Sequence, residues 1–194
     1  YTENNDIQGM QQLSYDPYHF LNIYTARLNE PGSNYFVGGY TYWPLQMSEG
    51  SYQQGFTLDY RCLPGESQQW PKAATHEAGH YFGLYHTFQT NCLAPDDAVD
   101  DTPRNDENFL QTCNIQDTCP NDPGNDPVEN HMNYSGDNCQ DTFTPGQNDR
   151  MHALIVLYHP SLLDNQAFYP VLSVDAFSFL NDTDGDNRFN PGDT

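Results

Sequence analysis

The stretch His76-Glu-Ala-Gly-His80-Tyr-Phe-Gly83-Leu-Tyr-His86 decides how this chain is interpreted. Residues four apart lie on one face of a helix, so His76 and His80 can offer imidazole nitrogens to one ion. His86 would lie about 80° away from that face if the helix continued. Gly83 can adopt a positive φ, end the helix and turn the chain so that His86 returns toward the other two. Three histidines with a fourth position open are typical of catalytic zinc.

The carboxylate of Glu77 completes this motif, because it stands next to a ligand and is the expected base for the zinc-bound water. The alternative is a chance HExxH whose histidines are merely buried. Glycine and histidine at the two further positions would occur by chance with a probability of about 0.3%, given 14 Gly and 7 His in 194 residues. We therefore expect a zinc hydrolase.

The flanking sequence predicts both strands and helices. Three short, aromatic and β-branched runs, bounded by turn residues, predict strands at residues 20–28, 35–43 and 55–63. A helix is expected over 70–83, with Pro71 in its first turn and Gly83 at its exit. Residues 1–18 look irregular.

The second half of the chain is less regular. Residues 87–143 form a loop too long for an ordinary connection, so disulfides and bound ions are expected to support it. A helix begins at the capping box Thr144-Pro-Gly-Gln147 and ends at Pro160. Residues 171–180 alternate like a strand.

Composition limits the partners. The 27 Asp and Glu against 6 Lys and Arg give a net charge of -21, which disfavours nucleic acid and membrane surfaces and favours cations and basic peptides. Fourteen Tyr and eleven Phe supply apolar bodies that an acidic disordered tail would lack. No apolar run approaches the roughly 20 residues of a membrane span, and no basic-then-apolar leader opens the chain. We expect a secreted, processed monomer.

Four cysteines crowd the irregular segment, at positions 92, 113, 119 and 139. Two disulfides there would fit an extracellular setting, and three pairings are open. Cys62 lies in an apolar stretch and is expected to be a buried free thiol.

A second motif, His131-Met132-Asn133-Tyr134, follows the histidines in the order found in the metzincin clan of zinc endopeptidases, which this chain resembles. The resemblance is closer still to the pappalysin family and covers about residues 19–160. It is carried, in the family's order, by Leu21-Asn-Ile-Tyr24, Asp59-Tyr-Arg61, His86-Thr-Phe88, Asp100-Asp-Thr-Pro103 and Phe143-Thr-Pro-Gly-Gln147.

The resemblance implies an α/β (α+β) metzincin-like fold. A mixed twisted sheet with the zinc-site helix would be followed by an irregular lower subdomain that disulfides and calcium stabilise and that ends in a helix. The catalytic domain would span 1–160, divided near 83 and 84. Residues 161–194 would be an extension, the start of a calcium-binding or β-sandwich module. Family members carry a strand, a long helix and another strand before the part that begins near Tyr18, and here only a short polar stretch precedes it.

The resemblance also assigns roles. Met132 would lie beneath the histidines, and the hydroxyl of Tyr134 would stabilise the oxyanion. The disulfides would join Cys92 to Cys119 and Cys113 to Cys139. The run 38–42 would be an edge strand that accepts an extended substrate, with contacts from Gly39, Tyr40 and Thr41. An ordinary edge strand with a bulge is the alternative.

Two acidic segments are candidates for structural calcium. Spacing like that of EF-hand and dockerin loops marks Asp182, Asp184, Asp186, Arg188 (through its carbonyl), Asn190 and Asp193. A solvated acidic linker is the other interpretation. The second segment lies where pappalysin relatives bind calcium and contributes Asp96, Asp97, Val99, Asp101 and Thr102.

Asp137 predicts the specificity. It lies where basic-specific pappalysin relatives place an aspartate, in the pocket for the side chain that follows the cleaved bond. A carboxylate there favours Arg or Lys, so we expect a secreted zinc endopeptidase that cleaves before these residues in proteins or peptides. A turn residue or a calcium ligand is the alternative role. Two other functions are a small-substrate zinc hydrolase of the deformylase type and a calcium-dependent binding module without catalysis.

Overall fold

The computed structural model describes residues 9–28, 36–66, 70–107 and 112–164. The chain divides into two compact units, Tyr1–Asp164 and Asn165–Thr194. The strand expected at 171–180 and the calcium loop expected at 182–193 belong to the second unit and lie outside the described residues. Among the helices of the described ranges, none is long and apolar enough to cross a membrane.

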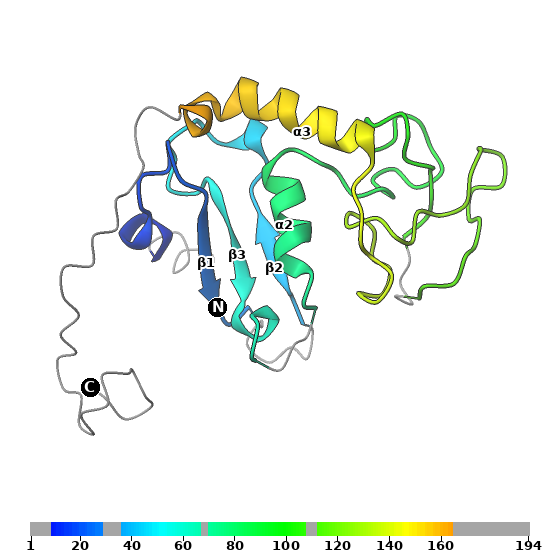
Figure 1. The fold of residues 1–194 in the computed structure, drawn as a ribbon, viewed down its shortest axis with the longest axis horizontal. Coiled ribbons are helices and arrows are strands. Elements are labelled where there is room, and N and C mark those ends of the chain that lie inside the picture. The colour runs from blue at the N-terminus through cyan, green and yellow to red at the C-terminus, as the bar shows by residue number, and fades with distance from the viewer. Residues whose placement is uncertain (1–8, 29–35, 67–69, 108–111, 165–194) are drawn as a thin grey trace. The chain divides into compact units, whose positions relative to one another are not determined.

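The three expected strands form one mixed sheet (Figure 1). They are β1 (Asn22–Ala26), β2 (Gly39–Thr41) and β3 (Gly55–Asp59), in the order β1-β3-β2. β1 runs parallel to the central β3, and β2 runs antiparallel to it. All five residues of β3 are buried, as expected for a strand covered on both faces. Because β3 is the central strand, β2 lies at an edge of this sheet.

Some predicted boundaries were wrong. The strand predicted over 55–63 stops at Asp59, because its carboxylate accepts a hydrogen bond from the backbone N–H of Arg61 and starts the 3-10 helix η2 (Tyr60–Cys62). The described part of the run predicted over 35–43 is a strand for three residues only, and the 3-10 helix η1 (Pro44–Gln46) follows it. Residues 9–13, predicted to be irregular, are helical.

The motif helix α2 (Ala73–Tyr81) packs on β2 and β3. The core between them contains Phe56, Leu58, Cys62, Ala73 and Tyr81, and the Cys62 thiol is free and buried, as predicted. The helix begins three residues later than predicted, since Trp70 has a φ of +57°, outside the helical region.

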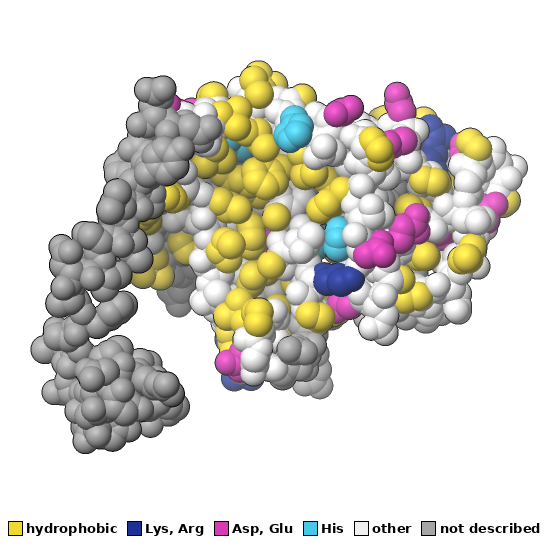
Figure 2. Space-filling view, in the orientation of Figure 1, with side chains coloured by type: hydrophobic (Ala, Val, Ile, Leu, Met, Phe, Trp, Pro, Cys, Tyr) yellow, Lys and Arg dark blue, Asp and Glu magenta, His cyan; other side chains and the backbone are white. Residues whose placement is uncertain are grey.

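The loop region and the last helix complete the first unit. Cys92–Cys119 and Cys113–Cys139 are bonded, which confirms the pairing implied by the resemblance. Helix α3 (Pro145–Tyr158) starts with the predicted capping box and is followed by the 3-10 helix η3 (Pro160–Leu163). α3 crosses the end of α2 (Figure 1), where the guanidinium of Arg150 donates to the carbonyl of Gly83. Figure 2 shows most of the visible acidic side chains over the loop region that follows α2.

Candidate active site

The three histidines of the motif converge. The Nε2 atom of His86 lies 3.1 Å from that of His76 and 3.0 Å from that of His80. The turn at Gly83 makes this possible: its φ is +92°, its N–H donates to the carbonyl of His80, and the N–H of Leu84 donates to the carbonyl of Gly79. These two bonds form a Schellman motif, which ends the helix and reverses the chain. Gly83 thus brings His86 back, as the sequence predicts.

Two backbone carbonyls orient the imidazole rings. Nδ1 of His76 lies 2.7 Å from the carbonyl oxygen of His131, and Nδ1 of His80 lies 2.8 Å from that of Leu84. A carbonyl oxygen can only accept, so both Nδ1 atoms carry the proton, and in neutral rings both Nε2 atoms present a lone pair.

This donor set fits a metal ion. Three Nε2 atoms face one another, and one proton on His86 Nε2 could bond well to only one of its two neighbours. Burial, followed by the neighbouring histidines, lowers the pKa of His76 to about 3 and that of His86 to about 2, and burial also lowers the pKa of His80. Neutral imidazoles with converging lone pairs are the state in which histidine binds zinc.

Glu77 lies beside this cluster on the pocket side of α2. Its side chain is buried, and burial raises its pKa to about 7 against a lowering by the Thr41 hydroxyl. The Oγ1 atom of Thr41 lies 2.5 Å from Oε2 of Glu77. Sequence reasoning missed this contact and assigned Thr41 to the substrate. A carboxylate with a pKa near neutrality can both accept and return a proton.

Two residues of the second motif contact α2 and the histidine cluster. Met132 is fully buried, and its sulfur packs so closely on Gly79 that a Cβ there would overlap it. The ring of Tyr134 lies 4.8 Å from that of His86 and 5.7 Å from that of His76, measured between centroids. Tyr134 thus lies beside two of the three histidines. Its role at the oxyanion and the place of Met132 beneath the histidines, both implied by the resemblance, stay predictions.

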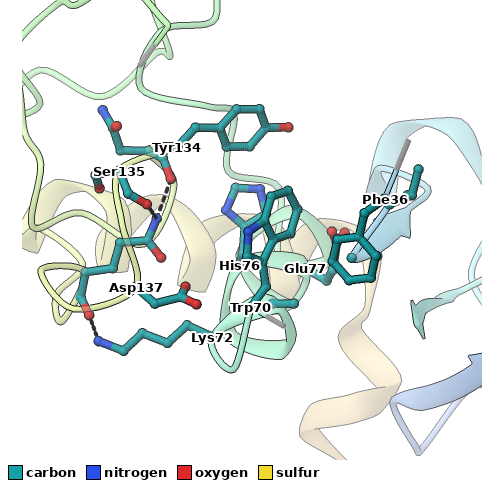
Figure 3. A pocket seen from close by; sticks show the side chains of 14 residues that line it. Phe36, Trp70, Lys72, His76, Glu77, Tyr134, Ser135 and Asp137 are labelled. Atoms are coloured by element: carbon teal, nitrogen blue, oxygen red, sulfur yellow. Dashed lines mark hydrogen bonds between the residues drawn. The ribbon is translucent and has the colours of Figure 1, made fainter. Parts of the chain in front are cut away.

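A pocket of about 130 Å³ adjoins His76 and Glu77. Figure 3 shows Asp137 and Lys72 on one side of it and Phe36 on the other. Burial raises the pKa of Asp137, and the Lys72 ammonium partly offsets this effect. Lys72 donates to the carbonyl of Gln140. Gly39 also lines this pocket, while Tyr40 packs on the ring of Tyr42. Lys72 could not be identified from the sequence, because it lies far from Asp137 along the chain and no motif links the two residues.

The acidic segment near 96–102 is tied by protein contacts. Asp96 pairs with Arg104, the hydroxyl of Thr102 lies 2.7 Å from Oδ2 of Asp97, and Asp101 accepts hydrogen bonds from Thr144 and Gly146 at the start of α3. In the ranges that the structure covers, the carboxylates of this segment do not converge as the histidines do. Calcium binding by this segment stays a prediction.

Comparisons with known proteins agree with this geometry. A family model described as Pregnancy-associated plasma protein-A matches residues 2–156. An extracellular metalloprotease of Pyricularia oryzae is 41% identical over 146 residues, which are 73% of this chain and 50% of that protein. An extracellular metalloprotease of Verticillium alfalfae is 38% identical over 165 residues, 80% of this chain and 56% of that protein. The chain thus spans about half the length of these curated relatives.

Among solved structures, mature mirolysin of Tannerella forsythia in complex with a cleaved peptide is similar, with a TM-score of 0.68 and 24% identity. The match covers 84% of this chain and 64% of that one. This likeness concerns the fold, and it confirms the expected metzincin-like arrangement.

Proposed function

This chain belongs to the pappalysin family, whose model is that of pregnancy-associated plasma protein-A, and on that premise we propose that it is a zinc-dependent endopeptidase. The observation that carries the proposal is the convergence of the Nε2 atoms of His76, His80 and His86, with two of the rings oriented by carbonyl oxygens. These three residues would hold the ion. When bound, zinc would polarise the scissile carbonyl and lower the pKa of a water molecule, so that this water could lose a proton and act as the nucleophile near neutral pH.

Glu77 is the general base in this proposal. Its buried carboxylate, with a pKa of about 7, takes a proton from the attacking water and later gives it to the leaving amine. The bond that breaks is the C–N bond of the peptide. The oxygen of the water becomes part of the new carboxylate, and both of its protons end on the leaving amine. The hydroxyl of Tyr134 would donate to the oxyanion, which its ring position beside His76 and His86 supports.

The substrate would lie extended along β2 and bury one side chain in the neighbouring pocket. β2 is an edge strand of the described sheet and is adjacent to Glu77 through Gly39 and Thr41. Asp137, in the pocket wall, would select Arg or Lys after the cleaved bond. A turn role for Asp137 would predict no such selection.

We also place the protein outside the cell, as a monomer that acts on proteins or peptides with basic residues. The two disulfides and the names of the relatives support the location. The catalytic domain would span residues 1–160, and the rest would be an extension. Calcium would stabilise the segment 96–102, the loop 182–193 or both.

The test combines metal analysis with cleavage of a peptide library by the full chain. We expect about one zinc per chain, cleavage inside peptides, and Glu77→Gln retaining zinc while losing activity about 10²–10⁴-fold. A variant Glu77→Gln with near-wild-type proteolysis would contradict the role of the base. Cleavage of small formylated substrates alone would favour the deformylase-type function, and zinc-free binding of a ligand would favour the binding module.

A further inference from the structure

Thr41 and Glu77 are joined across the gap between β2 and α2. The Thr41 hydroxyl lies 2.5 Å from Oε2 of Glu77 and 3.1 Å from the carbonyl oxygen of the same residue. A hydroxyl has one proton to donate, and a carboxylate accepts it more strongly than a peptide carbonyl does. The shorter distance also favours Oε2, so the proton of Thr41 goes to the carboxylate.

Gly39 makes the same approach possible two residues earlier in β2. A Cβ at this position would lie 2.7 Å from Cγ of Glu77 and 2.9 Å from its Oε1, closer than real Cβ contacts allow. Residues two apart in a strand face the same side, so positions 39 and 41 both face the carboxylate. Position 39 gives it space and position 41 gives it a hydrogen-bond donor.

The two carboxylate oxygens are thus unequal. Oε2 is held by Thr41, whereas no donor within the described parts of the chain reaches Oε1. Glu77 is only 6% exposed, but its side chain has three rotatable bonds, and burial alone does not choose among their rotamers. The hydroxyl of Thr41 supplies that choice.

We propose that Thr41 is a positioning residue: its hydroxyl fixes Oε2 of Glu77 so that Oε1 faces the attacking water. Thr41 also belongs to the edge strand on which the substrate would lie. One strand then fixes both the substrate backbone and the base relative to each other. This inference rests on the proposed function, since it takes Glu77 as the base.

The experiment measures kcat and KM of the zinc-loaded full chain on one cleavable peptide. Thr41→Val keeps the shape and removes the donor, and we expect kcat to fall about 10- to 100-fold while KM changes less than about threefold. Thr41→Ser keeps the donor and should recover most of kcat. In a Glu77→Gln background, Thr41→Val should lower kcat little further, because substitutions of two residues that act as a unit do not have additive effects.

Thr57→Val is the matched control. Thr57 is buried in the adjacent strand β3, and its hydroxyl has no partner among the residues the structure describes. Its removal should leave kcat unchanged. Zinc content and Tm are measured for every variant. If Thr41→Val does not fold, Thr41→Ala, which also lacks the hydroxyl, takes its place in the comparison with Thr41→Ser.

The outcomes separate this inference from the proposed function. A wild-type chain without zinc-dependent cleavage, or an active Glu77→Gln variant, would overturn the proposed function. A wild-type enzyme that Glu77→Gln inactivates, combined with full kcat in Thr41→Val, would overturn the role of Thr41 alone. Equal losses in Thr41→Ser and Thr41→Val would also overturn it, because the hydroxyl would then be irrelevant.

Discussion

The imidazole of His159 is stacked on the phenol ring of Tyr81, with centroids 4.7 Å apart and planes 11° from parallel. Tyr81 ends α2, one residue after the candidate ligand His80, and His159 is the C-cap of α3. Their exposed fractions are 1% and 2%. The stack therefore joins the end of the motif helix to the end of the last helix through a buried titratable ring.

The first prediction concerns acid stability. Burial lowers the pKa of His159 below its ordinary value, so the ring is neutral when folded and gains a proton on unfolding below about pH 6.5. The contribution of the neutral His159 ring to the free energy of unfolding is therefore fully present above about pH 6.5 and is lost as the pH falls toward the folded pKa. We expect the zinc-loaded wild type to lose more Tm between pH 7 and 5 than His159→Phe, which keeps an aromatic ring. His152→Gln, exposed on α3, is the control, and parallel curves for all three would contradict this.

The second prediction concerns Asp59 and Arg61. Burial alone would raise the pKa of Asp59, but hydrogen bonds from Arg61 and from the N–H groups of Leu28 and Arg61 outweigh it and lower the pKa. Asp59 is fully buried, so Asp59→Asn should cost about 2–4 kcal/mol in the free energy of unfolding at pH 7. Because the folded pKa is the lower one, this stability exists above about pH 4 and disappears as pH falls through the folded value.

Urea unfolding at pH 7 and pH 3 checks this, and the gap between the two proteins should narrow at pH 3. Arg104→Gln is the control, since it removes only partly exposed pairs with Asp96 and Asp122 and should cost less than about 1 kcal/mol. If Asp59→Asn and Arg104→Gln lowered the free energy of unfolding equally, burial would not make the Asp59–Arg61 pair more important for stability than the partly exposed pairs.

Local signals predicted the parts of the fold that depend on local chemistry. Gly83 ends its helix because a left-handed residue is needed there, and Thr144 with Gln147 begins the last helix because the capping box is complete within four residues. The strand boundary at Asp59 was missed although a capping aspartate is a local signal, because its partner, the N–H of Arg61, lay inside a run of strand-forming residues.

Contacts between distant segments could not be derived in this way. The bond from Thr41 to Glu77 spans 36 residues and depends on how β2 packs against α2. The approach of Lys72 to Gln140 spans 68 residues. No periodicity encodes such distances, and the cysteine pairing was available only through the family resemblance.

The third prediction concerns calcium. Asp97 is buried, and burial raises its pKa to about 6, so a bound cation would stabilise its charged form. In zinc-replete buffer, EGTA should lower Tm by about 5–10 °C if calcium stood near 100 times its Kd. Asp97→Asn should lose this response if the segment 96–102 binds the ion, and Asp184→Asn should lose it if the C-terminal loop does. An unchanged Tm after chelation would favour the linker interpretation of the loop and a surface role for the segment.

The last prediction concerns specificity and rests on the two opposite charges in the pocket. Asp137 and Lys72 both line it, and the ammonium of Lys72 partly offsets the rise that burial causes in the pKa of Asp137. A substrate arginine would add a second cation near the same carboxylate. Asp137→Ala should therefore reduce kcat/KM for peptides cleaved before Arg by about 30- to 100-fold relative to those cleaved before Leu.

Lys72→Met should act in the opposite direction, because it removes the competing cation while keeping an unbranched side chain. We expect the preference for Arg over Leu to rise about threefold or more. Asp141→Asn is the control, because it also removes one negative charge but at an exposed position outside the pocket. It should leave the preference for Arg over Leu unchanged, and the zinc content of every variant should equal that of the wild type. Profiling with a peptide library measures all four proteins together. A wild-type profile with large apolar residues after the cleaved bond would exclude Asp137 as the selecting group, and an unchanged profile in Lys72→Met would exclude Lys72 as its competitor.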